Sequence, residues 1–223
     1  MQCAHRDGSE TMSLRGAPAR RVLDSGLQAL GLPAGGSGAR RLLRYLELLE
    51  KWNRTYNLTA VRELQAMVTL LILDSLSAHP FLRGDRVLDV GSGAGLPGIP
   101  LAIFNPDREF VLLDSNGKKV RFMRHAVMDL GLPNVAVEQG RAEQYHPKAL
   151  FDTVISRALG SLGDLAATAG HLCRGGGHLL ALKGRYPKNE LAELPPGYRA
   201  VEVQRLQVPG LDAERHLVDI RRI

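Results

Sequence analysis

The chain has 223 residues, of which 44% are hydrophobic, so we expect one domain of ordinary size with room for a small added segment. Its 29 lysines and arginines outnumber 23 aspartates and glutamates, which suits a polyanionic partner but also a surface with a few extra arginines. Cys3 and Cys173 lie far apart, which argues against a disulfide framework or a zinc site. Without a long uncharged apolar run or a signal-peptide core, the chain is expected to be a soluble cytoplasmic protein.

The N-terminal part is rich in Gly, Pro, Ser, Ala and Arg. Its one weakly apolar patch is interrupted by Gly26, Gly31 and Pro33, so at most a short helix is expected there. The tract Gly35–Gly38 predicts a flexible joint. We therefore expect residues 1–38 to form a flexible N-terminal extension.

The next part of the chain has a helical pattern. Apolar residues recur at spacings of three and four from Ala39 to Trp52, which predicts an amphipathic helix. The polar stretch Asn53–Thr59 is expected to end this helix and to cap a second one over Glu63–Leu76. The apolar stripe could dock a partner, although covering the core is its more ordinary use. Residues 39–80 are expected to form a helical subdomain packed on the core.

A glycine-dense turn follows the short apolar run Val87–Val90, and an apolar helical segment from Pro97 to Phe104 comes after it. Gly91, Gly93 and Gly95 occupy every second position, so the backbone can adopt positive φ angles and approach a ligand closely. This order of strand, loop and helix predicts a site for a nucleotide-type cofactor. The alternative is a tight turn that binds nothing.

A second buried strand, Glu109–Asp114, ends in an acid 23 residues after Gly91 (114 − 91). In doubly wound sheets, an acid at the end of the neighbouring strand accepts hydrogen bonds from the hydroxyls of a ribose. The alternative is that Asp114 caps the following helix, Gly117–Leu130. The two roles are compatible, and ribose binding is favoured.

Strands and helices alternate through most of the remaining chain. The expected elements are strands over Asn134–Glu138, Phe151–Ser156 and Gly177–Lys183 and a helix over Ser161–Leu172. This alternation predicts an α/β fold with a mostly parallel sheet covered on both faces. The last two strands, at 198–208 and 215–223, have no helix between them and should form an antiparallel hairpin. Residues 81–223 would make up this domain.

In an open parallel sheet, ligands bind beyond the carboxyl ends of the strands. The basic residues that follow the predicted strands are Lys118, Lys119, Arg141, Arg157 and Lys183. Each could be ordinary surface charge, but their convergence favours an anionic ligand. Phosphate-loop, nucleophile-elbow and metal-helix motifs are absent and the seven histidines are scattered. Hydrolysis, phosphoryl transfer and a metal site are therefore disfavoured.

The glycine loop has the form Asp-x-Gly-x-Gly-x-Gly from Asp89 to Gly95, and with the terminal hairpin it resembles the Rossmann-like class I S-adenosylmethionine-dependent methyltransferases. Further motifs sharpen the resemblance: Tyr56–Ala60, Leu112–Lys119, Gly140–Glu143, Ser156–Ala158 and Glu214–His216. Together they are similar to the bacterial small-subunit ribosomal RNA methyltransferase G family, also called glucose-inhibited division protein B. The resemblance covers Arg40 to Ile223.

This resemblance implies transfer of a methyl group from S-adenosylmethionine to N7 of one guanine in 16S ribosomal RNA. It implies 16S ribosomal RNA or the small ribosomal subunit as partner, no membrane, and a cytoplasmic enzyme, which we expect to be a monomer. The residues it assigns to the cofactor are Gly91, Gly93, Leu96, Asp114, Ala142, Glu143 and Arg157. Those it assigns to cofactor or RNA binding are Lys118, Lys119, Arg141 and Arg215. Because Arg157 leaves a strand beside the expected methyl position, it is also the candidate catalytic residue.

One departure from the family pattern is visible. The family usually has a His within the segment that matches Leu70–Leu76, and this chain has Leu71 there. Any contact that this His makes to RNA or to a helical lid must be absent or replaced. Two alternative functions stay open, namely a methyltransferase for another acceptor and a cofactor-regulated RNA-binding protein without turnover.

Overall fold

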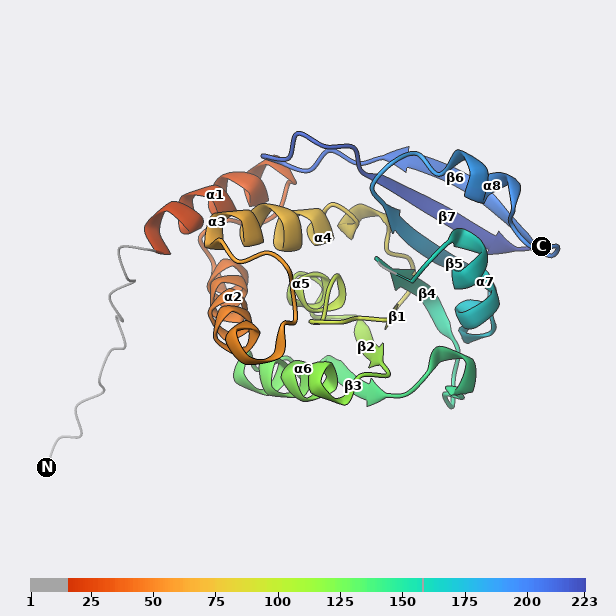
Figure 1. Cartoon of the computed structure of the whole chain (residues 1–223), viewed down its shortest axis with the longest axis horizontal. Helices are drawn as coiled ribbons and strands as arrows, with labels where there is room; N and C mark the ends of the chain where they lie inside the picture. Colours follow the sequence, from red (N-terminus) through yellow and green to blue (C-terminus); the bar gives the residue numbers. More distant parts are fainter. Residues whose placement is uncertain (1–15, 158) are drawn as a thin grey trace, which may run out of the picture.

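The computed structural model describes residues 16–157 and 159–223. Within them, seven strands form one sheet in the order β3-β2-β1-β4-β5-β7-β6 (Figure 1). The strands are β1 (Arg86–Val90), β2 (Glu109–Asp114), β3 (Val135–Gln139), β4 (Phe151–Ser156), β5 (Cys173–Lys183), β6 (Tyr198–Arg205) and β7 (His216–Arg222). Strands β1 to β5 are parallel, and β7 pairs antiparallel with both β5 and β6. The expected α/β class with a C-terminal antiparallel hairpin is confirmed.

Helices cover both faces of this sheet (Figure 1). They are α1 (Gly16–Ala29), α2 (Ser37–Tyr56), α3 (Leu64–Met67), α4 (Asp74–Leu76), α5 (Gly98–Ile103), α6 (Gly117–Asp129), α7 (Leu162–Ala169) and α8 (Lys188–Ala192). A π-helical segment, η1 (Val68–Leu73), joins α3 to α4, and the short 3-10 turns are η2 (His79–Phe81), η3 (Ala142–Gln144) and η4 (Gly170–Leu172). Helix α8 was not predicted, because five residues are too few to show a periodic pattern.

Alternate residues of the central strands enter two separate cores. In β1, Val87 belongs to the core shared with α2, α5 and α6, whereas Leu88 and Val90 belong to the core under α7. Successive side chains of a strand point to opposite faces, so each strand contributes to both cores. Burial on both faces explains why these strands appear in the sequence as short continuous apolar runs.

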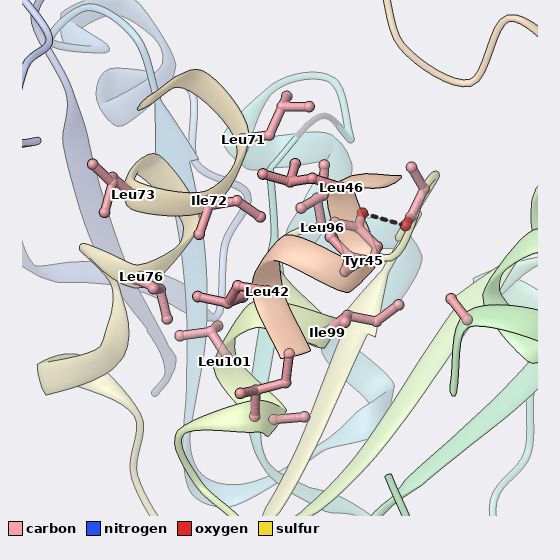
Figure 2. Packing of buried hydrophobic residues seen from close by; sticks show 14 of the residues in the cluster. Leu42, Tyr45, Leu46, Leu71, Ile72, Leu73, Leu76, Leu96, Ile99 and Leu101 are labelled. Carbon is pink, nitrogen blue, oxygen red and sulfur yellow. Dashed lines mark hydrogen bonds between the residues drawn. The ribbon is translucent and has the colours of Figure 1, made fainter. Parts of the chain in front are cut away.

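Helix α2 covers the core, as its apolar stripe predicted. Leu42 and Leu46 of α2 belong to the same buried cluster as Leu71 and Ile72 of η1 (Figure 2). The hydroxyl of the fully buried Tyr45 donates a hydrogen bond of 2.7 Å to the carbonyl of Ala94 in the glycine loop (Figure 2). Helix α2 therefore also braces the loop that follows β1.

The helical run Leu64–Phe81 has 18 residues and a mean hydropathy of 1.2, which would suffice by length and composition to cross a membrane. In this fold, 56% of the run is buried inside the protein. Such burial is typical of a core helix.

The predicted position of the second helix cap is wrong. Asn53 lies inside α2, where its side chain exchanges two hydrogen bonds with the backbone of Thr59 and so closes the loop after the helix. The side chain of Glu63 caps α3 instead, accepting hydrogen bonds from the N–H groups of Gln65 and Ala66 at 2.9 and 2.6 Å. A glutamate carboxylate at this position satisfies two N–H groups that have no partner within the helix.

The expectation of a flexible extension is wrong for residues 16–38, while residues 1–15 lie outside the described residues. Leu23 and Leu27 of α1 are fully buried. Gly26, which interrupts the apolar pattern, lies inside α1, and a Cβ there would approach the side chain of Leu73 to 2.3 Å. The glycine is therefore a point of close packing rather than a helix breaker. The tract Gly35–Gly38, expected to be a flexible joint, is tied to α1, because the N–H of Gly35 donates a hydrogen bond of 3.0 Å to Asp24 Oδ1.

Candidate active site

Two cavities open along the carboxyl edge of the parallel strands. The strand order reverses between β1 and β4, which is where ligands bind in sheets of this kind. The first cavity, of about 310 Å³, is lined by residues that include Gly91, Asp114, Lys119, Arg141, Ala142 and Glu143. The second cavity, of about 410 Å³, is lined by residues that include Thr59, Leu71, Asp74, Arg157, Lys183 and Arg215.

A small hollow between these two cavities shares lining residues with both of them. It is lined in part by Leu159, which also lines the first cavity, and by Arg157 and Lys183, which also line the second. The three openings therefore form a row over the ends of β1, β4 and β5. Two ligands placed in the two larger cavities would meet near Arg157 and Leu159.

The glycine loop is held against the end of β2. Gly91 and Gly93 have φ angles of +68° and +62°, a region that residues with a Cβ rarely adopt. The N–H of Gly91 donates to the carbonyl of Leu113 at 2.8 Å, and the N–H of Gly93 donates to Asp114 Oδ2 at 2.8 Å. The loop therefore has a fixed path beside the first cavity, and the predicted need for glycine is confirmed at both positions.

Asp114 lies at the end of β2 and is only 7% exposed. Its Oδ1 accepts a hydrogen bond of 2.8 Å from the N–H of Asn116, and Lys119 Nζ lies 4.0 Å from its Oδ2. The cap of α6 is Asn116, whose side chain accepts from the N–H groups that open this helix. Asp114 is therefore not the helix cap, and each of its oxygens keeps a lone pair for a ligand in the first cavity.

Residues after β3 form another wall of the first cavity. Ala142 is buried, whereas Arg141 and Glu143 are exposed at the rim. The structure adds Leu159 and Thr168, which the sequence did not indicate. Thr168 belongs to α7, and nothing in its local sequence shows that this helix packs against η3, the turn that follows β3.

Five predicted residues lie outside the lining of the first cavity, namely Gly93, Leu96, Lys118, Arg157 and Arg215, of which the two arginines line the second cavity. Leu96 is buried beside Tyr45 and Leu46 in the core (Figure 2), so any contact with a ligand would come from its backbone. Lys118 is exposed at the start of α6, where its N–H donates to Asn116. Its side chain faces solvent near the carboxyl edge.

Three charged groups meet at the second cavity. Arg157 Nη1 lies 3.5 Å from Asp74 Oδ2 and donates a hydrogen bond of 3.2 Å to the carbonyl of Leu70. Arg215 Nε donates to Asp74 Oδ1 at 2.9 Å. Burial raises the pKa of Asp74, and the two arginines act in the opposite direction. Both oxygens of this carboxylate are therefore occupied by guanidinium groups.

The remaining wall of the second cavity is partly apolar. Leu71, at the position where the resembling family usually has His, is 3% exposed and lines this cavity. Lys183 Nζ lies 2.7 Å from Glu190 Oε2 and donates to the carbonyl of Gly160 at 2.7 Å. The charge of Lys183 is therefore already matched within the protein, which the sequence did not indicate.

Asp74 is the main residue of this edge that sequence reasoning missed. The signal was present, because Asp74 is an acid directly after the apolar run Leu70–Leu73 in a predicted helix. An acid among residues that a helix buries requires a partner. Identifying that partner required the tertiary structure, since Arg157 and Arg215 come from distant parts of the chain.

Asp89 is a buried acid beneath the glycine loop. It is fully buried, its Oδ2 accepts a hydrogen bond of 2.8 Å from the N–H of Gly98, and burial raises its pKa to about 7. Its Oδ1 has no hydrogen-bond partner among the described residues. Asp89 is not among the lining residues of either cavity, so it supports the loop and the start of α5.

The chemistry available at this edge is that of binding and orientation. Among residues 16–157 and 159–223, no three His, Cys, Asp or Glu side chains lie together as a metal site would require. The first cavity offers a carboxylate and backbone groups, and the second offers guanidinium donors beside an apolar wall. This pair of cavities can bring two ligands together in a fixed geometry.

Comparison with known proteins identifies the family. A family model described as rRNA small subunit methyltransferase G matches residues 39–218. The chain belongs to this family. Proteins named ribosomal RNA small subunit methyltransferase G from Nitrosococcus oceani and Methylococcus capsulatus are 53% and 54% identical to it over 200 residues. These matches cover 90% of this chain and 94% and 97% of the two relatives, so the resemblance seen in the sequence is confirmed.

Solved structures show the same fold at much lower identity. TrmN from Thermus thermophilus matches with a TM-score of 0.53 and 17% identity over 78% of this chain and 53% of that chain. A SAM-dependent methyltransferase from Aquifex aeolicus matches with a TM-score of 0.53 and 18% identity over 70% of this chain and 92% of that chain. The expected Rossmann-like methyltransferase fold is confirmed.

Proposed function

We propose that this protein transfers the methyl group of S-adenosylmethionine to N7 of a guanine in 16S ribosomal RNA of the small ribosomal subunit. The observation that carries the proposal is the pair of adjacent cavities at the point where the strand order reverses. One cavity has the groups that bind a nucleoside, and the other has donors that suit a second base. Membership of the rRNA small subunit methyltransferase G family supports this choice of acceptor.

The residues of the first cavity fit S-adenosylmethionine. When bound, this cofactor supplies an electrophilic methyl group on a positively charged sulfur. The carboxylate oxygens of Asp114 would accept hydrogen bonds from the hydroxyls of its ribose. Ala142 and Glu143 would lie against its adenine. A Cβ on Gly91 would lie 3.1 Å from Leu159, so the absence of a side chain keeps this edge of the cavity open for the methionine end.

The second cavity suits a guanine that reacts at N7. This nitrogen has a free lone pair, so no proton needs to be removed and no general base is required. Guanine presents O6 and N7 as acceptors on one edge. The N–H groups of Arg157 and Arg215 would bind O6 and leave N7 directed toward the first cavity. The main contribution of the protein is then orientation, whose ceiling is about 7–11 kcal/mol, with added stabilisation from fixed charges.

Basic side chains beside the cavities would hold the RNA backbone. Lys118 and Arg141 are exposed, and Lys119 is half-exposed at the rim of the first cavity. Contacts to phosphates position a nucleic acid without reading its sequence. The formal net charge of +6 supports the same type of partner.

We also propose that the protein acts in the cytoplasm. We expect it to act as a monomer, because a single chain supplies both cavities. Residues 39–80 contribute to the same hydrophobic core as residues 81–223. We therefore treat 39–80 as a subdomain that covers a methyltransferase domain at 81–223. Sedimentation of the purified protein tests the monomer, and a dimer at micromolar concentration would contradict it.

The deciding experiment is a methylation map of 16S ribosomal RNA. Small subunits that lack the modification are incubated with the protein and S-adenosylmethionine, and the RNA is mapped by primer extension and mass spectrometry. A new 7-methylguanosine at one position is expected, and S-adenosylhomocysteine in place of the cofactor is the control. RNA binding without methylation would favour the non-catalytic alternative. Methyl transfer only to another class of molecule would favour a different acceptor.

A further inference from the structure

The buried acid Asp74 forms ion pairs with both Arg157 and Arg215. We propose that Asp74 is a positioning residue, which holds the two guanidinium groups in place on the wall of the second cavity so that they can bind the acceptor base. This inference rests on the proposed function and extends it to a residue that contacts the base only through the arginines. Its basis is geometry, because both oxygens of the carboxylate are paired with arginines from separate parts of the chain.

The cluster joins three distant parts of the chain. Asp74 begins α4, Arg157 follows β4, and Arg215 precedes β7. The distances are 3.5 Å from Asp74 Oδ2 to Arg157 Nη1 and 2.9 Å from Asp74 Oδ1 to Arg215 Nε. Arginine side chains are long and have several rotatable bonds, so a shared carboxylate removes much of their freedom before a ligand binds.

The π-helical turn before Asp74 places two acceptors, the Leu70 carbonyl and the Asp74 carboxylate, near Nη1 of Arg157. In η1, the N–H of Asp74 donates to the carbonyl of Thr69, five residues earlier, which is the π-helical pairing. Arg157 Nη1 lies within reach of both the Leu70 carbonyl, at 3.2 Å, and the Asp74 carboxylate. Single π turns occur frequently at functional sites. Here the turn fixes Arg157 from two sides while 27% of its side chain stays exposed.

The charges of the cluster leave the cavity positive. Asp74 is 6% exposed, and its single negative charge faces two arginines, so one positive charge is left over. Lys183 adds nothing to this balance because Glu190 matches it. The cavity wall thus has N–H donors to offer and no free carboxylate from Asp74, which suits the acceptor atoms of a guanine edge.

The test is a set of variants measured with small subunits as the methyl acceptor. In D74N the side chain keeps its shape but loses its charge and one acceptor atom, so the arginines lose their common anchor. We expect kcat/KM for the subunit to fall about 10- to 100-fold, the range that a misplaced reactive geometry produces. The Kd for S-adenosylmethionine, measured by calorimetry without RNA, should change less than about 3-fold, because Asp74 does not line the first cavity.

The matched control is D129N, which removes a carboxylate from a different arginine. Asp129 accepts two hydrogen bonds from Arg44, at 2.8 and 2.9 Å, and neither residue is among the described residues that line the first or the second cavity. This variant should keep wild-type kcat/KM. Wild-type kcat/KM in D74N, or an equal loss of activity and cofactor affinity together with a lower thermal midpoint, would overturn the positioning role.

A double-variant cycle separates positioning from a structural role. If Asp74 acts through the arginines, D74N should lower kcat/KM less in R215A than in the wild type, because R215A has already removed one of the two guanidinium groups that Asp74 holds. A loss equal to the product of the two single losses contradicts the proposal. Should D74N fail to fold, R215K tests the same contact from the other side, and wild-type kcat/KM in R215K would then overturn it. An inactive wild-type protein would instead refute the proposed function itself.

Discussion

Arg157 is the residue that belongs to both halves of the candidate site. It lines the second cavity and the hollow beside the first, and its Nη1 is held by the Leu70 carbonyl and Asp74. A guanidinium at this place can bind the acceptor base and stabilise the charges that change during methyl transfer. The sequence placed Arg157 here because it directly follows a buried strand of the parallel sheet.

Replacing Arg157 with Ala is expected to lower kcat at least 100-fold while the thermal midpoint changes little, because the side chain is partly exposed and lies at a cavity wall. Methyl transfer to small subunits and a thermal scan measure the two effects. Arg174→Ala is the control, since Arg174 pairs with Asp152 outside both cavities. Full activity of Arg157→Ala would remove this arginine from the mechanism.

Asp89 predicts a pH dependence of stability. Its pKa is raised by burial from 3.8 to about 7, so the folded state holds this proton more tightly than the unfolded state does. The stabilisation is fully present below about pH 4 and is lost as pH rises through about 7, a change of about 4 kcal/mol for this group alone. Urea unfolding at pH 5 and pH 8 should show a smaller difference in Asp89→Asn than in the wild type. Equal differences in the two proteins would show that Asp89 does not titrate in this way.

At the scale of elements, buried strands were the most predictable part of the fold. The bounds of β2 and β4 match the expected ranges, since each is a short apolar run between polar or turn-forming residues. The glycine loop and the residues after β2 and β3 were also predicted, because a parallel sheet brings these strand ends to one edge. These features could be predicted because they depend only on the local sequence and on the topology of the sheet.

Contributions from helices could not be predicted in the same way. Asp74 and Thr168 lie on helices and line the cavities, and the placement of these helices depends on tertiary packing. The N-terminal helix was expected to be short and loosely attached for a related reason. Gly26 interrupts the apolar pattern of α1. The reason for a glycine at this position is visible only in the folded structure, where it packs against Leu73.

Gly26→Ala tests this account of α1. The new methyl group would overlap the buried side chain of Leu73, and overpacking of this kind costs about 1–3 kcal/mol, against a gain of up to about 1 kcal/mol in helix propensity. We expect a net loss in the free energy of unfolding, measured with urea. Ser25→Ala, at an exposed position of the same helix, should leave stability unchanged or slightly raised. A Gly26→Ala protein that is more stable than wild type would contradict the close packing.

At the scale of the whole molecule, the positive net charge favours binding to RNA. With a formal net charge of +6, binding to 16S ribosomal RNA should weaken steeply as salt rises, because each neutralised phosphate releases counterions. Lys118→Ala should reduce the slope of log K against log salt by about 0.7–0.9 if its side chain contacts a phosphate. Filter binding over a salt series measures the slope, with Lys51→Ala on α2 as the comparison. An unchanged slope would place Lys118 outside the RNA contact.

The antiparallel hairpin determines whether the second cavity is complete. Strand β7 fills the position between β5 and β6 (Figure 1), and Arg215, directly before β7, lines the second cavity. The first cavity has no lining residue from the hairpin. Loss of the β7 pairing would therefore remove one wall of the acceptor cavity and leave the first cavity in place.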